Sequence, residues 1–121
     1  MIQIDNQSRF PVYEQITAQV RAHILSGVLR EGEQMPSVRT LSMDLHLNPN
    51  TVQKAYTELD RAELIGSVPG RGTFVRDGAR ERLRAAGRAD IDAWVTHSRQ
   101  LLQCGVAKEE LITLINKEEI S

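Results

Sequence analysis

Residues 36–75 read PSVRTLSMDLHLNPNTVQKAYTELDRAELIGSVPGRGTFV, and two helix starts lie within this segment. Ser37 can accept a hydrogen bond from a free backbone N–H, so it suits the residue before a short helix that ends near His46. Asn48 is a good cap for a second helix, and Pro49 fits its first position, where a missing N–H costs nothing. About one residue separates the two helices, which predicts a sharp angle between them. The apolar contacts of the first helix are expected from Val38, Leu41, Met43 and Leu45.

The second of these helices is amphipathic. Its apolar side is expected to contain Val52, Ala55, Tyr56, Leu59 and Ala62. The opposite side is polar and comprises Asn50, Lys54, Thr57 and Arg61, with Gln53 on the flank. Taken by itself, this pattern fits a merely solvated helix face equally well. The segments on either side decide between the two interpretations.

A hairpin is expected directly after this helix. Two short β-leaning runs, residues 64–68 and 73–75, flank the turn Pro69-Gly70-Arg71-Gly72, whose glycines permit positive φ. Two helices followed by such a hairpin predict a winged helix-turn-helix, which places one helix in the major groove of duplex DNA and the hairpin tip near the backbone or minor groove. Arg71 at the tip can reach a phosphate or the minor groove; the alternative is an arginine that only keeps the loop soluble.

Another amphipathic helix is expected upstream, over about residues 11–25. Pro11 suits its first turn and Gly27 its end. The apolar stripe repeats every four residues and is widened by neighbouring apolar side chains. Its members are Val12, Tyr13, Ile16, Val20, Ile24, Leu25 and Val28. A polar loop follows at residues 31–33.

Residues 77–121 change in composition and predict two further helices. Gly87 and Asp90 can bend or interrupt the first, and Gly105 suits its end. Because two such helices have little core of their own, we expect their apolar stripes to pack on a second copy of the chain. The residues expected at this dimer interface are Leu83, Ile91, Trp94, Val95, Leu101, Leu102, Leu111 and Ile115.

The expected fold is therefore mainly α with a small β-hairpin. A winged helix-turn-helix DNA-binding domain is expected over residues 1–76, and a helical dimerisation tail over residues 77–121. The formal net charge of -1 counts against a nonspecific basic coat for nucleic acid, although local positive charge at a contact face can coexist with it. No apolar run approaches the roughly 18 residues of a membrane span, and no signal-peptide pattern begins the chain, so we expect a cytoplasmic protein without a membrane partner.

Neither enzymatic nor metal-dependent chemistry is expected. The chain has one cysteine, Cys104, which we expect to be a buried thiol. His23, His46 and His97 are far apart and lack neighbouring ligands at metal-binding spacing, although His97 and Cys104 could meet across a dimer interface. The sequence contains no phosphate-binding glycine loop or serine-nucleophile motif, and no cofactor is predicted.

Three motifs in this order resemble the GntR family of bacterial transcriptional regulators: PSVRTL at residues 36–41, NPNTVQKAYTEL at residues 48–59 and GRGTFV at residues 70–75. The resemblance covers about residues 10–76, and the brief two-helix tail is similar to that of the YtrA subfamily, the smallest GntR type. It implies a cytoplasmic, dimeric, DNA-binding repressor whose tail mediates dimerisation and whose targets are often transporter genes.

The resemblance also implies roles for individual residues. Ser37 and Arg39 would contact phosphate and base edges, and Gly70 and Arg71 would form the wing contact. The residues facing the major groove would be Asn48, Asn50, Thr51, Gln53 and Lys54. Arg39 is the leading candidate for base reading, because its guanidinium fork matches guanine N7 and O6, whereas the Lys54 ammonium suits a phosphate. Some family members carry extra arginines on the second helix, so their base preferences do not transfer to this chain.

Two alternatives stay open at this point. The near-neutral charge also suits a winged-helix domain that docks on a protein rather than on DNA. Some GntR relatives carry a fused aminotransferase-like domain, for which we expect no room in 121 residues. A small-molecule effector would need a pocket at the dimer interface or between tail and DNA-binding domain, and Trp94 would either line that pocket or fill the dimer core.

Overall fold

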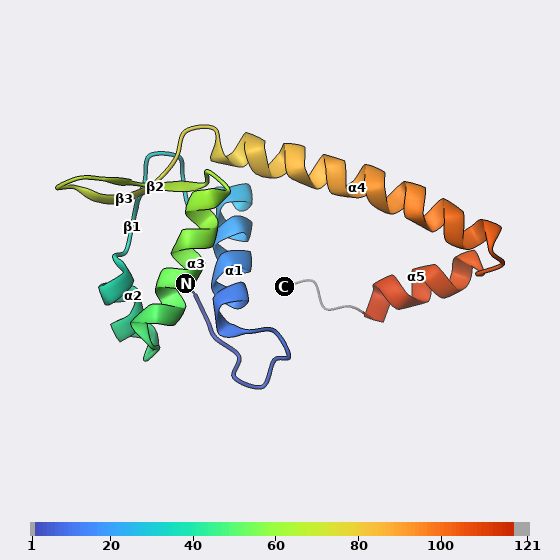
Figure 1. Cartoon of the computed structure of the whole chain (residues 1–121), viewed down its shortest axis with the longest axis horizontal. Coiled ribbons are helices and arrows are strands. Elements are labelled where there is room, and N and C mark those ends of the chain that lie inside the picture. Colours follow the sequence, from blue (N-terminus) through green and yellow to red (C-terminus); the bar gives the residue numbers. More distant parts are fainter. Residues whose placement is uncertain (1, 118–121) are drawn as a thin grey trace. The chain divides into compact units, whose positions relative to one another are not determined.

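The computed structural model describes residues 2–117 and is mainly helical, with a small antiparallel sheet (Figure 1). The chain divides into two compact units, residues 1–83 and 84–121, which we call the head and the tail. The predicted fold class, a winged helix-turn-helix followed by two helices, is confirmed. The elements in chain order are α1 (Val12–Ser26), β1 (Gln34–Met35), α2 (Val38–Leu45), α3 (Pro49–Arg61), β2 (Ile65–Val68), β3 (Gly72–Val75), α4 (Ala79–Gln103) and α5 (Lys108–Lys117).

Side-chain caps set the ends of α2 and α3, as the sequence predicts. The Ser37 Oγ accepts a hydrogen bond of 3.0 Å from the Thr40 backbone N–H. The Asn48 Oδ1 accepts one of 2.8 Å from the Asn50 backbone N–H. α2 ends at His46, which adopts the left-handed conformation with φ 55°. Leu47 is therefore the single residue between the cap that ends α2 and the cap that begins α3. This short connection fixes the angle between the two helices.

The head has one continuous apolar core between α1, α3 and the sheet. Figure 1 shows α1 and α3 side by side, and their contact is among the most extensive between elements. Burying one aliphatic side chain contributes roughly 1.5–3 kcal/mol to the free energy of unfolding. The largest fully buried side chains are Ile16, Val20, Ile24, Val52, Leu59, Leu64, Ile65 and Val75.

Four side chains predicted to be apolar contacts are exposed instead. Leu25 comes directly after Ile24, the last buried residue of α1, and its side chain lies outside the buried stripe. Val28 lies beyond the end of α1. Met43 is 64% exposed, because the residues two positions before and after it face the core. Ala62 is exposed because it follows α3 and caps its end.

The hairpin predicted after α3 is confirmed and is joined by a third strand. The strand order is β1-β3-β2, and β2 pairs with β3 from Ile65 opposite Val75 to Val68 opposite Gly72. The turn between them, which we call the wing tip (residues 69–72), has positive φ of 76° at Gly70 and 123° at Gly72. The sequence does not predict β1, because a strand of two residues is too short to show an alternating pattern.

The first tail helix ends where predicted, and two details of the tail differ from expectation. α4 runs without interruption through Gly87 and Asp90, and it ends just before Gly105, which adopts φ 95°. No side chain among residues 84–117 is buried. Cys104 is exposed rather than buried, because it lies in the turn between α4 and α5.

Candidate nucleic-acid interface

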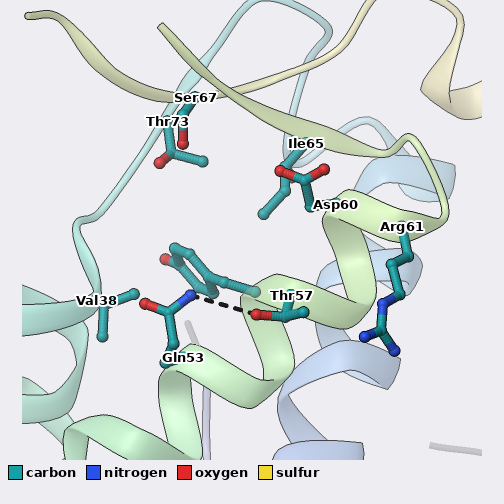
Figure 2. A pocket seen from close by; sticks show the side chains of 9 residues that line it. Val38, Gln53, Thr57, Asp60, Arg61, Ile65, Ser67 and Thr73 are labelled. Carbon is teal, nitrogen blue, oxygen red and sulfur yellow. Dashed lines mark hydrogen bonds between the residues drawn. The ribbon is translucent and has the colours of Figure 1, made fainter. Parts of the chain in front are cut away.

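The outward side of α3 is polar and accessible. Asn50, Gln53 and Lys54 are exposed, and Thr51 is half-buried. The Gln53 Nε2 donates a hydrogen bond of 3.3 Å to the Thr57 Oγ1, one turn further along (Figure 2). The first turn of α3 contains no acidic residue. This face therefore offers amide, hydroxyl and ammonium groups to a ligand, without a carboxylate at its leading end.

An aromatic ring from α1 supports the lysine of this face. The Lys54 Nζ lies 3.9 Å from the centroid of the Tyr13 ring. A cation at this distance is attracted by the negative face of the ring. The sequence predicts Tyr13 only as part of the α1 stripe, since no spacing rule connects it with a lysine on another helix.

The start of α2 brings an arginine beside this face. Arg39 is exposed in the first turn of α2, and its guanidinium makes no hydrogen bond or ion pair within residues 2–117. All five of its N–H donors are therefore available to a ligand. The Ser37 hydroxyl, by contrast, is used in the cap: it accepts from the Thr40 N–H and donates to the Thr40 Oγ1 at 2.9 Å.

The wing tip presents a second arginine. Arg71 is exposed, and its backbone N–H donates to the Val68 carbonyl at 2.9 Å, which closes the turn. At Gly70 beside it, no other atom lies within 4 Å of the position that a Cβ would take, so the backbone can approach a ligand closely there. The Gln34 Nε2, from β1, donates to the Arg71 carbonyl oxygen at 3.0 Å. Gln34 is not among the site residues that the sequence predicts, because β1 itself leaves no pattern.

A hollow of about 240 Å³ separates α3 from the strands of the wing. In Figure 2, Ser67 and Thr73 project from the strands above it, and Gln53 and Thr57 border it on α3. Asp60 supplies the one carboxylate of its lining. Apolar side chains, Val38 and Ile65, share the lining with these polar groups, and Arg61 supplies its one cation.

A buried hydrogen bond connects α3 with the segment before α2. The Tyr56 hydroxyl donates to the Pro36 carbonyl oxygen, and burial of the ring raises the pKa of this phenol to about 12. The phenol thus stays protonated and donating over the whole physiological pH range. The bond holds the start of α2, and with it Arg39, against α3.

Between residues 2 and 117, no group of three or more His, Cys, Asp or Glu side chains is arranged to hold a metal ion. No helix in that range is long and apolar enough to cross a lipid bilayer.

The eight side chains predicted for dimerisation lie in three environments. Leu83 packs against the head core, because α4 begins inside the head. Leu101 and Leu111 are half-buried within the tail. The remaining five are between 41% and 52% exposed: Ile91, Trp94, Val95, Leu102 and Ile115. The described part of the tail therefore carries an apolar stripe that it does not cover itself.

Comparison with known families decides what this arrangement is. Residues 12–75 match the family described as bacterial regulatory proteins, gntR family. This chain belongs to the gntR family. The family match begins with α1 and ends with β3, so it contains the polar face of α3, the start of α2 and the wing. The helices α4 and α5 lie outside it.

Individual gntR relatives agree with this assignment. The chain is 46% identical over 83 residues to the HTH-type transcriptional repressor YtrA of Bacillus subtilis, which covers 69% of this chain and 64% of YtrA, just under two thirds of its length. It is 32% identical over 114 residues to the uncharacterized HTH-type transcriptional regulator YhcF of the same species, covering 90% of this chain and 92% of YhcF.

Solved structures of other proteins share the fold. YtrA from Sulfolobus acidocaldarius, a GntR-family transcription factor, superimposes with a TM-score of 0.62 at 33% identity, covering 96% of this chain and 94% of that one. The DNA-binding domain of AraR in complex with the operator ORR3 matches with a TM-score of 0.50 at 28% identity, covering 60% of this chain and 90% of that one. The chain is thus a gntR-family transcriptional regulator with a DNA-binding head.

Proposed function

We propose that this regulator is a homodimeric repressor that binds a palindromic operator through α3, the start of α2 and the wing tip. The observation that carries the proposal is the exposure of three cations on the start of α2, on α3 and at the wing tip. Arg39 lies in the first turn of α2, Lys54 lies on α3, and Arg71 stands at the wing tip. The AraR complex supports the proposal, since a domain of the same fold there binds an operator.

Each group has a role that fits its chemistry. With α3 in the major groove, Arg39 donates two parallel hydrogen bonds to guanine O6 and N7. The exposed amides of Asn50 and Gln53 can each donate and accept, which suits adenine. Lys54 pairs with a phosphate as a point charge. Asn48 uses its oxygen in the helix cap, so only its amide N–H groups face the DNA.

The hollow between α3 and the wing has a place in the same geometry. If α3 occupies the major groove and Arg71 the adjacent minor groove, the DNA backbone between the two grooves passes over the hollow. The hydroxyls of Ser67 and Thr73 are then neutral donors for a phosphate oxygen. Asp60 and Arg61 also line the hollow, and their opposite charges act on a phosphate in opposite directions.

The tail supports the twofold arrangement of the proposal. Its uncovered apolar stripe is best covered by the same stripe of a second copy, since closed twofold dimers are the commonest homo-oligomers. Two heads related in this way read two half-sites about one helical turn apart, or a multiple of it. Operation in the cytoplasm and control of a transporter operon are proposed on the family resemblance alone.

A binding experiment tests the base-reading role. Operators are selected from random duplexes with the full chain, and affinities for the selected duplex and for a scrambled one are measured by fluorescence anisotropy at several salt concentrations. Loss of a bidentate guanine contact costs about 1–3 kcal/mol, so Arg39→Ala should weaken specific binding about 5- to 150-fold and nonspecific binding far less. Arg30→Ala is the matched control, because Arg30 lies in the loop at the base of the wing, away from its tip.

Three outcomes would contradict the proposal. Selection that enriches no palindromic site removes the operator. Equal loss of specific and nonspecific binding in Arg39→Ala removes the base-reading role. Charge reversal by Lys54→Glu and Arg71→Glu that leaves DNA affinity unchanged, while abolishing capture of a protein partner, favours the protein-docking alternative.

A further inference from the structure

We propose that Gln34 is a positioning residue for DNA binding, which holds the wing tip where Arg71 meets the minor groove. This inference rests on the proposed wing contact and adds a residue that does not itself touch DNA. Its basis is the juxtaposition of the β1 side chain with the backbone of the tip: the Gln34 Nε2 lies 3.0 Å from the Arg71 carbonyl oxygen.

The wing tip extends beyond the part of the sheet where β1 pairs with β3. β1 pairs with β3 only at residues 34 and 35, opposite Phe74 and Thr73, so no strand backbone extends beside residues 69–72 on that side. Within the turn, the Arg71 N–H donates to the Val68 carbonyl, and Val68 also pairs with Gly72 at the end of the strand ladder. The Gln34 amide supplies the contact that β1 is too short to make with its backbone.

Two further observations describe the space at this contact. A Cβ at Gly72 would lie 2.7 Å from the Gln34 Nε2, so a side chain there would collide with the amide unless the amide moved. Gly72 also has a φ of 123°, which favours glycine. The amide thus occupies room that a glycine leaves open.

The other end of β1 is anchored in the core of the head. Met35 is 3% exposed in the core, and the next residue, Pro36, accepts the hydrogen bond from Tyr56 of α3. Ser37 then begins α2. Residues 34–37 therefore connect the wing tip, α3 and α2 in one short segment, so Gln34 sets the wing tip relative to the helix that reads the major groove.

A double-mutant cycle tests the inference. Gln34→Met keeps the length of the side chain and removes its donor; Arg71→Ala removes the wing contact. Arg71→Ala should weaken operator binding about 10-fold and lower the slope of log affinity against log salt by about 1. Gln34→Met should weaken binding about 3- to 10-fold, and in the Arg71→Ala background it should cause no further loss, because its effect passes through Arg71.

A measurement on the free protein separates wing position from effects on DNA. Hydrogen exchange of the Arg71 N–H reports the order of the turn, and Gln34→Met should accelerate it without changing the urea midpoint of the head. Gln34→Arg restores an N–H donor of similar reach and should return the exchange rate toward that of the wild type.

These experiments distinguish a failure of the role proposed for Gln34 from a failure of the proposed function. Equal losses from Gln34→Met in both backgrounds, or unchanged exchange of the Arg71 N–H, overturn the role of Gln34 and leave the proposed function intact. An Arg71→Ala variant that binds the operator like the wild type removes the wing contact and the role of Gln34 with it, whereas the base-reading role is then judged on Arg39→Ala alone.

Discussion

Head and tail use apolar residues in opposite ways. In the head, Ile16, Val52 and Leu59 from two helices reach 0% exposure against one another and the sheet. In the tail, Trp94 and Leu114 stay 52% and 54% exposed. A unit that buries its own side chains carries its stability within itself, whereas helices without a core depend on another surface. The difference predicts that mutations in the head change folding and that mutations in the tail change association.

Truncation of the head core should have the largest effect. Leu59→Ala removes a fully buried side chain and leaves a cavity, which lowers the free energy of unfolding by about 2–5 kcal/mol. Leu114→Ala is the matched control in the tail and should change the free energy of unfolding by less than about 1 kcal/mol. Urea denaturation followed by circular dichroism measures both. Equal losses would mean that the tail has a core of its own.

Truncation of the tail should act on association instead. Trp94→Ala removes the largest side chain of the uncovered stripe, and a central aromatic residue of an interface is worth about 2 kcal/mol, or about 30-fold in the dimer dissociation constant. Arg99→Ala, another exposed residue of α4, should leave the constant unchanged. Sedimentation equilibrium measures the dimer dissociation constant of both variants. A wild-type chain that is monomeric at high micromolar concentration would remove the dimer altogether.

A smaller effect is expected from the bond that ties α3 to the segment before α2. Tyr56→Phe removes the donor to the Pro36 carbonyl and should cost about 1 kcal/mol of unfolding free energy at pH 7. The folded-state pKa of about 12 lies above the usual tyrosine pKa of about 10. The stabilisation by the protonated phenol is therefore fully present below pH 10 and is lost as pH rises through 12.

Unfolding of the wild type and of Tyr56→Phe at increasing pH checks the direction of this pH dependence. The difference in unfolding free energy between the two proteins should shrink between pH 10 and pH 12. A difference that grows over that interval would contradict the assignment of the raised pKa to the buried, neutral phenol.

The smallest effect concerns the exposed thiol of the tail. Cys104→Ser should change the unfolding free energy by no more than about 0.5 kcal/mol, since the side chain is exposed in a turn. In the native protein, Cys104 should react with a thiol reagent as fast as in the urea-unfolded chain. A strongly protected thiol would show that the interface between two copies extends over the turn between α4 and α5.

The sequence predicts those parts of the fold that depend on local chemistry. Ser37 and Asn48 cap their helices because a short polar side chain reaches the free N–H groups nearby, and Gly70 permits the turn of the wing. Contacts between distant segments leave no such signal. The Lys54 ammonium over the Tyr13 ring and the third strand both depend on how elements pack, so they are found only in the structure.

Burial was the property least accessible to pattern alone. Met43 lies in a helix of two turns, where one residue of shift moves a side chain from core to solvent, and it proves to be exposed. Cys104 follows an apolar stripe but lies in a turn. For the site, the structure places the predicted DNA-facing residues at the surface of one head. Their roles remain predictions, because contacts with DNA are determined by the complex.

The two helix caps restrict how the DNA preference of this regulator can evolve. Ser37 and Asn48 hold α2 and α3 through their side-chain oxygens, so a change at either position alters the helix on which the neighbouring groups depend. Arg39, Asn50 and Gln53 are exposed and cap neither helix. New operator preferences should therefore arise first at these three positions, where substitutions leave the scaffold unchanged.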